Sequence, residues 1–486
     1  AIERARAQEA FWSEMTRWLP FLLLAGAGAP AAENGPLRVS VIGGPPTLVD
    51  PIRRAPDETQ RVMLGAVTQG LVGFDAAGQI SPALAQRWIV TSDGLSAIFR
   101  LGPATWPDGR RVTTTEVARR ARALLAPASR NPLRPAFDSI DEIVAVTPEV
   151  IEFRLRTPRP PLLELLAQPE ATMLSRAGVG TGPFRLLSRQ GDTAVLEPRN
   201  GGSSGAIMIV GERAARAVAR FRAGEAELVL GGTALDWPLV SVAGLQPRSV
   251  QLDPAEGLFG LSVVRARGFL GEAANREVLA MAIDRPAMLA AFAAPRWEAA
   301  LGLLPAPYRS AAAPALPGWA ALDQAGRLDT ARRRVATWGG EPPLIRVHLP
   351  QGPGANLLYA RLVADWRRVG LNVARAERHD ADVVLVDRVA PAGSAIWYLG
   401  TVACPAPAQG ACVDEAQAAL AAARASQALE DRGTQLALAD RAVADSGLWI
   451  PIARPLRWSL VSPRLTGFRP NARAWHPLDR LVAVRR

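Results

Sequence analysis

Residues 69–109 read QGLVGFDAAGQISPALAQRWIVTSDGLSAIFRLGPATWPDG, a series of short apolar runs separated by turn residues. Asp-Gly pairs, at residues 93–94 and 108–109, are typical of tight turns between antiparallel strands. The run Ser96–Leu101 lies between these two turns and predicts a strand. We therefore expect a small unit built of hairpins, with Phe99 and Trp106 packed inside it.

On both sides of this stretch, apolar strand patterns alternate with amphipathic helix patterns. Strands are predicted at Leu37–Gly43 and at Val150–Arg156, where apolar and polar residues alternate strictly. Helices are predicted at Glu58–Val72 and Thr113–Leu125, and a third helical run at Arg276–Ala293. This alternation indicates an α/β fold.

Two helix boundaries are predicted by particular residues. Thr114 or Thr115, together with Glu116, forms a plausible N-terminal cap for the helix that ends at Leu125. Pro286 is expected to interrupt the third helical run at Asp284-Arg285, because proline disfavours helical backbone in the residue before it.

Length and composition are those of a folded globular protein. The chain has 486 residues and a mass of 51.7 kDa, which corresponds to roughly three domains. Hydrophobic residues make up 49% and charged residues 21%, so disordered and collagen-like classes are excluded. No apolar run approaches the roughly 18 residues that a membrane-spanning helix needs, which excludes a polytopic membrane protein.

The basic residues are all arginine. Lys and Arg total 56 against 45 Asp and Glu, which gives a net charge of +11, and the sequence contains no lysine. A Schiff-base lysine and a P-loop lysine are therefore excluded within this chain. Because the arginines are spread along the chain without a basic cluster, we expect no nucleic-acid partner.

Residues 1–31 are predicted to be a leader. Arg17, a short apolar core and the small residues Ala29-Pro30-Ala31 have the order of a secretory signal over about residues 15–31. The residues before Met15 fit no signal pattern, so we expect translation to begin at Met15. No cysteine follows the cleavage site, so we expect a secreted protein without a lipid anchor.

The two cysteines, Cys404 and Cys412, are close in sequence and lie in a Pro- and Gly-rich segment. For an exported chain, this spacing predicts a local disulfide. A zinc site is the less favoured alternative, because two cysteines without a nearby histidine do not fill a tetrahedral site.

No self-sufficient catalytic or metal-binding motif is found in the sequence. Residues 201–205 match G-x-S-x-G but lack the flanking buried strand and following helix of a nucleophile elbow, so a hairpin loop is the better interpretation. His379 stands beside Asp380 and Asp382 without a second ligand at metal spacing. We therefore expect a non-enzymatic protein with no cofactor and no metal.

Several blocks occur together in the order found in one family. They are Pro46-Thr-Leu-Val-Asp-Pro51, the stretch 69–109 quoted above, Gly180-Thr-Gly-Pro-Phe184, and Arg276-Glu-Val-Leu-Ala-Met-Ala-Ile-Asp-Arg285. From Leu37 to the end, the chain resembles the family 5 extracellular solute-binding proteins of ABC importers, the dipeptide-, oligopeptide- and nickel-binding class. Agreement among many weak blocks carries more weight than any single block.

The resemblance implies a two-lobed periplasmic-binding-protein fold of type II with an extra small lobe. Two crossings, expected near Glu256–Val263 and Trp449–Pro455, would hinge the lobes around a ligand. The expected parts are lobe I at 35–55, 178–257 and 455–486, the extra lobe at 56–177, and lobe II at 258–454.

The resemblance also directs attention to the cleft walls. Peptide-binding members have a G-W-x-G-D stretch whose aspartate pairs with the ligand's amine, and counting back from Cys404 places Pro391 or Ala392 at that aspartate. Asp387 is the nearest carboxylate and a candidate partner for a cation. Trp397 could stack on a ligand, although core packing is an equally good interpretation.

The remaining ligand-binding candidates come from two other sources. Pro46 and Thr47 lie on the early turn, which we expect to line the cleft. Arg265 and Arg388 could bind an anionic ligand through paired hydrogen bonds, although surface ion pairing is the more common role of an arginine.

The function implied by the resemblance is that of a monomeric periplasmic receptor. It would bind a small solute, peptide or peptide-like, and deliver it to an ABC permease in the inner membrane. Three alternatives stay open. They are a receptor with this fold for a non-peptide ligand or a metal chelate, a cell-surface receptor that signals to a partner, and a secreted α/β hydrolase.

Overall fold

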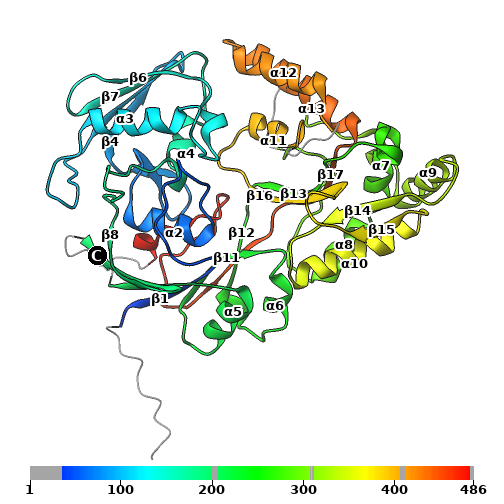
Figure 1. Ribbon diagram of the computed structural model, residues 1–486, viewed down its shortest axis with the longest axis horizontal. Helices are drawn as coiled ribbons and strands as arrows, with labels where there is room; N and C mark the ends of the chain where they lie inside the picture. The colour runs from blue at the N-terminus through cyan, green and yellow to red at the C-terminus, as the bar shows by residue number, and fades with distance from the viewer. Residues whose placement is uncertain (1–34, 200–204, 307, 309–310, 406–410, 482–486) are drawn as a thin grey trace, which may run out of the picture. The chain divides into compact units, whose positions relative to one another are not determined.

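The computed structural model describes residues 35–199, 205–306, 308, 311–405 and 411–481 (Figure 1). The predicted leader and residues 201–204 of the G-x-S-x-G match lie outside these ranges. Residues Leu37–Arg486 form one unit by their contacts, and the description below concerns that unit. Among its described helices, none is long and apolar enough to cross a membrane.

The first sheet has seven strands, and its centre is β1 (Leu37–Ile42), which runs parallel to both of its neighbours. The other pairs in this sheet are antiparallel. The order across the sheet is β12 (Val250–Asp253), β18 (Arg457–Val461), β11 (Leu228–Thr233), β1, β10 (Ile207–Glu212), β9 (Thr193–Pro198) and β8 (Phe184–Gln190). The associated helices are α2 (Glu58–Val67), α5 (Ala214–Arg222) and α6 (Trp237–Ser241).

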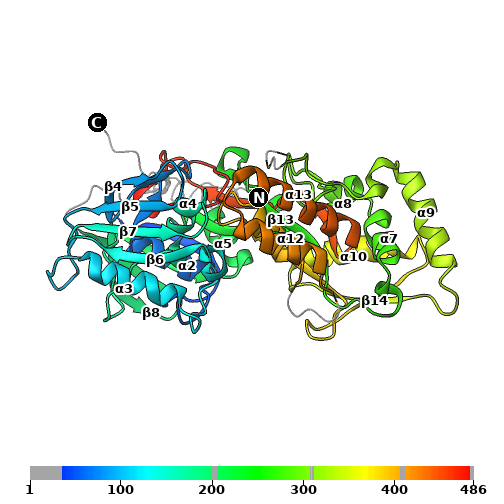
Figure 2. The ribbon, with the colours of Figure 1, turned by 90° about the horizontal axis from the view of Figure 1, so that it is seen from above.

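The second sheet has five strands and lies among the largest group of helices (Figures 1 and 2). Its order is β15 (Asn372–Arg375), β14 (Leu344–His348), β16 (Val383–Val389), β13 (Gly257–Val263) and β17 (Trp449–Ala453). The helices are α7 (Ala273–Ala282), α8 (Arg285–Phe292), α9 (Gln324–Ala336), α10 (Pro353–Arg367), α11 (Ala395–Val402), α12 (Asp414–Ala425) and α13 (Leu429–Ser446).

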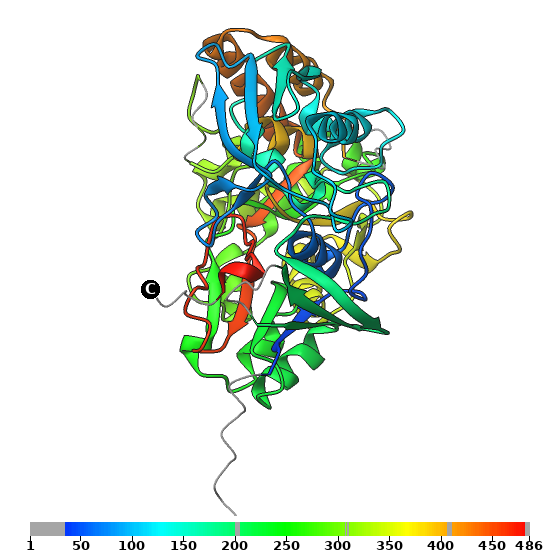
Figure 3. The same cartoon turned by 90° about the vertical axis from the view of Figure 1, so that its left-hand side faces the viewer.

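Residues 69–109 contribute two strands, β4 and β5, to a separate four-stranded antiparallel sheet. Its order is β4 (Ala85–Val90), β5 (Ser96–Leu101), β7 (Val150–Leu155) and β6 (Ile140–Ala145), preceded by the hairpin of β2 (Val72–Phe74) and β3 (Ile80–Pro82). Helix α3 (Thr114–Leu125) packs beside the strands (Figure 3), and α4 (Leu162–Leu166) follows β7. Phe99 and Trp106 are both buried, as predicted.

Two clusters of buried apolar side chains meet at the seven-stranded sheet. Along β11, Leu228 and Leu230 belong to the cluster that includes the four-stranded sheet, while Val229 between them belongs to the cluster of the five-stranded sheet. This is the period-two alternation of a strand that is buried on both faces. The seven-stranded sheet therefore separates the two cores.

The chain passes between the seven- and five-stranded sheets twice. The first connection joins β12 to β13 through residues 254–256, and the second joins β17 to β18 through residues 454–456. The predicted crossings overlap these connections, but most of each predicted range forms a strand of the five-stranded sheet. The expected lobe ranges stay a prediction.

Gly257, at the first connection, has a backbone conformation that requires glycine. Its φ is +154°, and a Cβ atom there would lie 2.0 Å from the carbonyl oxygen of Arg388. The two strands β13 and β16 can therefore begin their pairing this close to the crossing only because no side chain is present.

Two helix boundaries differ from the sequence predictions. Helix α2 ends at Val67 rather than at Val72, because Thr68 adopts an extended backbone while its hydroxyl donates to the Leu64 carbonyl at 2.6 Å. Helix α3 is capped by Thr113, not by Thr114 or Thr115, through a reciprocal capping box with Glu116. The predicted interruption before Pro286 is confirmed, with Asp284 capping α8.

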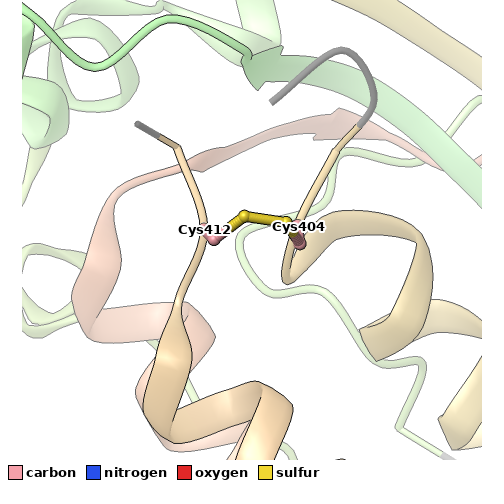
Figure 4. The surroundings of a disulfide bond; sticks show 2 residues. All are labelled: Cys404 and Cys412. Carbon is pink, nitrogen blue, oxygen red and sulfur yellow. A yellow bond between two sulfur atoms is a disulfide. The ribbon is translucent and has the colours of Figure 1, made fainter. Parts of the chain in front are cut away.

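Cys404 and Cys412 form a disulfide between the end of α11 and the start of α12 (Figure 4). Beside it, the Val413 amide donates to the Ala403 carbonyl at 2.8 Å. The predicted disulfide is confirmed, and it ties α11, which carries Trp397, to α12.

Asp440 on α13 is a buried carboxylate, and its protonation should affect the stability of the fold. Its carboxylate accepts a hydrogen bond from the Ala315 amide at 2.6 Å, and burial raises the pKa of Asp440 from 3.8 to about 6. The folded state therefore holds an extra proton between these pKa values, so this group makes stability fall as pH rises from about 4 to 6.

The Asp440→Asn variant should not show this fall in stability with rising pH, because an asparagine side chain does not titrate. We expect the free energy of unfolding of the variant, relative to the parent chain, to rise by roughly 1–3 kcal/mol between pH 4 and pH 7.5, measured by urea denaturation. Asp445→Asn, on the same helix with an exposed side chain, is the matched control. An Asp440→Asn effect equal at both pH values would contradict the assignment.

Candidate functional site

A cavity of about 590 Å³ opens between the seven- and five-stranded sheets. Its size is in the range of small-molecule binding sites. The walls come from segments far apart in sequence: α2, the end of β11, the end of β16 and the loop after it, α11, the start of β18, and residues 473–476 of the C-terminal segment. Within the part of the chain that the structure describes, no cluster of metal-ligating side chains is found.

Strand β11 forms a flat part of this wall because Gly232 faces Trp458. A Cβ atom at Gly232 would lie 2.1 Å from the Trp458 ring, so the indole packs directly on the backbone. Trp458 is buried and its indole nitrogen donates to the Thr233 carbonyl at 2.8 Å. A larger residue at 232 would displace this aromatic wall.

One ion pair joins the two sheets inside the cavity. Arg457 Nη1, at the start of β18, lies 2.7 Å from Asp387 Oδ1 on β16, and the two side chains are 14% and 11% exposed. Burial raises the pKa of Asp387, and the charge of Arg457 only partly offsets this effect. Burial and the charge of Asp387 also raise the pKa of Asp236, which lines the same cavity.

A second charged group comes from α2 and the segment before β8. Arg61 Nε lies 2.7 Å from Glu170 Oε1, and Arg61 Nη1 lies 3.0 Å from Glu58 Oε2. Burial lowers the pKa of Arg61, but the charges of Glu170 and Glu58 outweigh it and raise the pKa. The guanidinium also lies over the Trp475 ring, 5.4 Å from its centroid, which orients that indole beside the cavity.

A third charged group closes the end of the cavity next to the β16–α11 loop. Glu164 Oε2 accepts from the Gly393 amide at 2.6 Å and pairs with Arg473 Nη2 at 2.7 Å. The Gln168 side chain donates to the Pro391 carbonyl in the same loop. These contacts hold the loop after β16, a strand of the five-stranded sheet, against α4, Gln168 and the C-terminal segment.

The neighbouring His476 belongs to a buried structural pair. Its Nε2 lies 3.2 Å from Asp253 Oδ2, and the other oxygen of Asp253 accepts from the Asn471 amide at 2.9 Å. The His476 ring stacks on Phe468 with 4.1 Å between centroids. This network fixes the C-terminal segment that carries Arg473 and Trp475.

Three of the six predicted ligand-binding residues line the cavity: Asp387, Arg388 and Trp397. Arg388 is exposed, and within the described residues its side chain makes no ion pair. Trp397 is half-buried, and its ring meets that of Tyr398 edge to face with 5.0 Å between centroids. Trp397 therefore packs against Tyr398 and also lines the cavity.

The other three predicted residues are not among those lining the cavity. Pro46 is buried, and Thr47 accepts a hydrogen bond from Gln60 at 3.0 Å. Arg265 is buried and donates to the carbonyls of His379 and Asp380 at 2.6 and 3.0 Å. Thr47 and Arg265 thus bind other parts of the chain, and the contact of the three residues with a ligand stays a prediction.

Sequence reasoning missed most of the charged residues of the cavity. These are Glu58, Arg61, Glu170, Asp236, Asp253, Arg457 and Arg473. They stand on segments whose proximity is created only by the tertiary fold. The single sequence signal that could have indicated part of the group is the position of Arg457 directly after the predicted second crossing.

Comparisons with known proteins agree with this architecture. The model of the bacterial extracellular solute-binding proteins, family 5 (middle region), matches residues 79–385. The Escherichia coli nickel-binding periplasmic protein is 24% identical over 65% of this chain and 67% of its own length. A glutathione-binding protein of Pectobacterium atrosepticum is 29% identical, over 34% of this chain and 34% of that protein.

Among solved structures, the murein tripeptide-binding protein of E. coli has a TM-score of 0.79 with 17% identity, and the match covers 93% of this chain and 98% of that one. This likeness confirms the predicted two-lobed fold class. Since the family model matches well over half of the chain, the protein belongs to the bacterial extracellular solute-binding proteins, family 5.

Proposed function

We propose that this protein is the solute-binding component of an ABC importer. It holds a small solute, peptide-like in size, in the cavity between the two sheets and delivers it to a permease in the inner membrane. The observation that carries the proposal is the cavity itself, because its walls and its charges come from both sheets. A solute held there contacts both lobes and favours their closed arrangement.

The proposed setting follows from the same role. The chain is exported to the periplasm by its leader and acts there as a monomer that binds without altering its ligand. The printed names of its relatives include nickel-, glutathione- and murein tripeptide-binding proteins, which supports a small polar solute.

Native mass spectrometry of protein isolated from its own periplasm tests the proposal. We expect a copurified solute that dissociates on mild unfolding and rebinds with one-to-one stoichiometry. Arg388→Gln should weaken rebinding about tenfold in calorimetry, because a charge-assisted contact inside the cavity is lost. Arg333→Gln, in an exposed pair within α9, is the control. Retention of no solute, and no binding from a broad solute library, would contradict the function.

We expect closure of the lobes to be stabilised by contacts that lie outside the cavity. Arg424, at the end of α12, pairs through Nε with Asp138 Oδ2 at 3.2 Å, and its carbonyl accepts from the Thr157 hydroxyl at 3.0 Å. Gln427 donates to the Arg156 carbonyl at 2.7 Å. These bonds link the helical hairpin beside the five-stranded sheet to the unit of the four-stranded sheet.

Arg424→Gln should therefore weaken solute binding although Arg424 is not among the residues lining the cavity. We expect the dissociation constant to rise roughly fivefold or more, since the ion pair with Asp138 is lost from the arrangement that encloses the cavity. Calorimetry with the copurified solute measures the change, and Arg333→Gln again serves as control. An unchanged dissociation constant would show that these contacts do not contribute to closure.

A further inference from the structure

The end of the cavity next to Pro391 carries a positively charged side chain, that of Arg473. Of the residues that line the cavity, Pro391, Gln168 and Arg473 meet here. The Gln168 side chain donates to the Pro391 carbonyl, the Gly393 amide donates to Glu164, and Glu164 forms an ion pair with Arg473. Arg473 is the only charged one of these three. Glu164 is not among the lining residues, and its Oε2 already accepts from the Gly393 amide and pairs with Arg473.

Arg473 has hydrogen-bonding capacity left over. Its side chain is 13% exposed and pairs with Glu164 through Nη2 alone. Within the described residues, its Nη1 is buried and has no hydrogen-bond partner. A buried donor without a partner is energetically unfavourable, and a ligand that supplies an acceptor removes this cost.

The other arginines of the cavity are arranged differently. Arg61 is held between two glutamates, and Arg457 is paired with Asp387. Arg388 carries no ion pair within the described residues, but it is an exposed side chain with unrestricted access to water. Arg473 is therefore the cavity cation that combines burial with an unused donor.

We propose that Arg473 makes the Pro391 end of the cavity a subsite for an anionic group of the ligand, a carboxylate or another oxyanion. A guanidinium with free donors binds such a group with charge-assisted hydrogen bonds. An ammonium group in the same place meets a like charge and the apolar ring of Pro391. The proposal rests on the proposed function, since it names the chemistry of the solute bound in that cavity.

A matched pair of probes tests the subsite. N-succinyl-dialanine and dialanine share a backbone but present a carboxylate and an ammonium, respectively, at one end. We expect the parent chain to bind the succinyl probe at least about tenfold more tightly in calorimetry, the size of one charge-assisted contact. Arg473→Gln should abolish the difference, and Arg473→Lys, which keeps the charge, should retain a preference.

Controls separate the subsite from folding and from the proposed function. Arg464→Gln, an exposed arginine paired with Glu227, should change neither affinity, and thermal unfolding checks that each variant is folded. Tighter binding of dialanine, or an equal preference in Arg473→Gln, would overturn the inference. Binding of the copurified solute with no binding of either probe would overturn it as well, while leaving the proposed function intact.

Discussion

The ion pair of Asp387 with Arg457 is the interaction on which the arrangement of the cavity depends. Both residues lie close to the places where the chain changes sheet. Asp387 is paired in register with Phe259, near the start of β13, and Arg457 begins β18 directly after the second connection. The pair therefore joins the two sheets close to the two connections between them.

The free energy of this ion pair is a balance between desolvation and attraction, because both side chains are largely buried. Removing two charges from water costs several kcal/mol for each ion, and only close approach recovers it. Because Asp387 lies on the five-stranded sheet and Arg457 on the seven-stranded sheet, their contact joins the two sheets. Most charged side chains of the cavity wall are thus held in ion pairs, of which Asp387 with Arg457 joins the two sheets.

The sequence predicted the architecture better than the site. Hairpin turns at Asp93-Gly94 and Asp108-Gly109, the interruption at Asp284 and the disulfide are local features, set by neighbouring residues. Local rules failed where tertiary contacts decide: α2 ends at Val67 because the Thr68 hydroxyl turns back on Leu64. Periodicity gave no indication that Arg61, Arg457 and Arg473 converge. Glu170, Asp387 and Glu164, with which they pair, lie far away in sequence.

The stretch Asp387–Trp397 illustrates both outcomes. Its position relative to Cys404 suggested a cleft wall, and six of its residues do line the cavity: Asp387, Arg388, Val389, Ala390, Pro391 and Trp397. The early turn at Pro46 and Thr47 was expected to line the cleft as well, and in the structure Thr47 accepts a hydrogen bond from Gln60 of α2. The resemblance pointed to a segment that lines the cavity. Only the positions of the side chains show which residues line it and which contact other parts of the chain.

The central claim is that a solute binds between the two sheets. The most direct measurement is an X-ray structure of the protein crystallised with the solute it retains on purification. We expect density for that solute enclosed between the Asp387–Pro391 segment and residues 457–475, in contact with elements of both sheets. Density bound to one lobe alone, such as in the surface groove between α12 and α13, would contradict it.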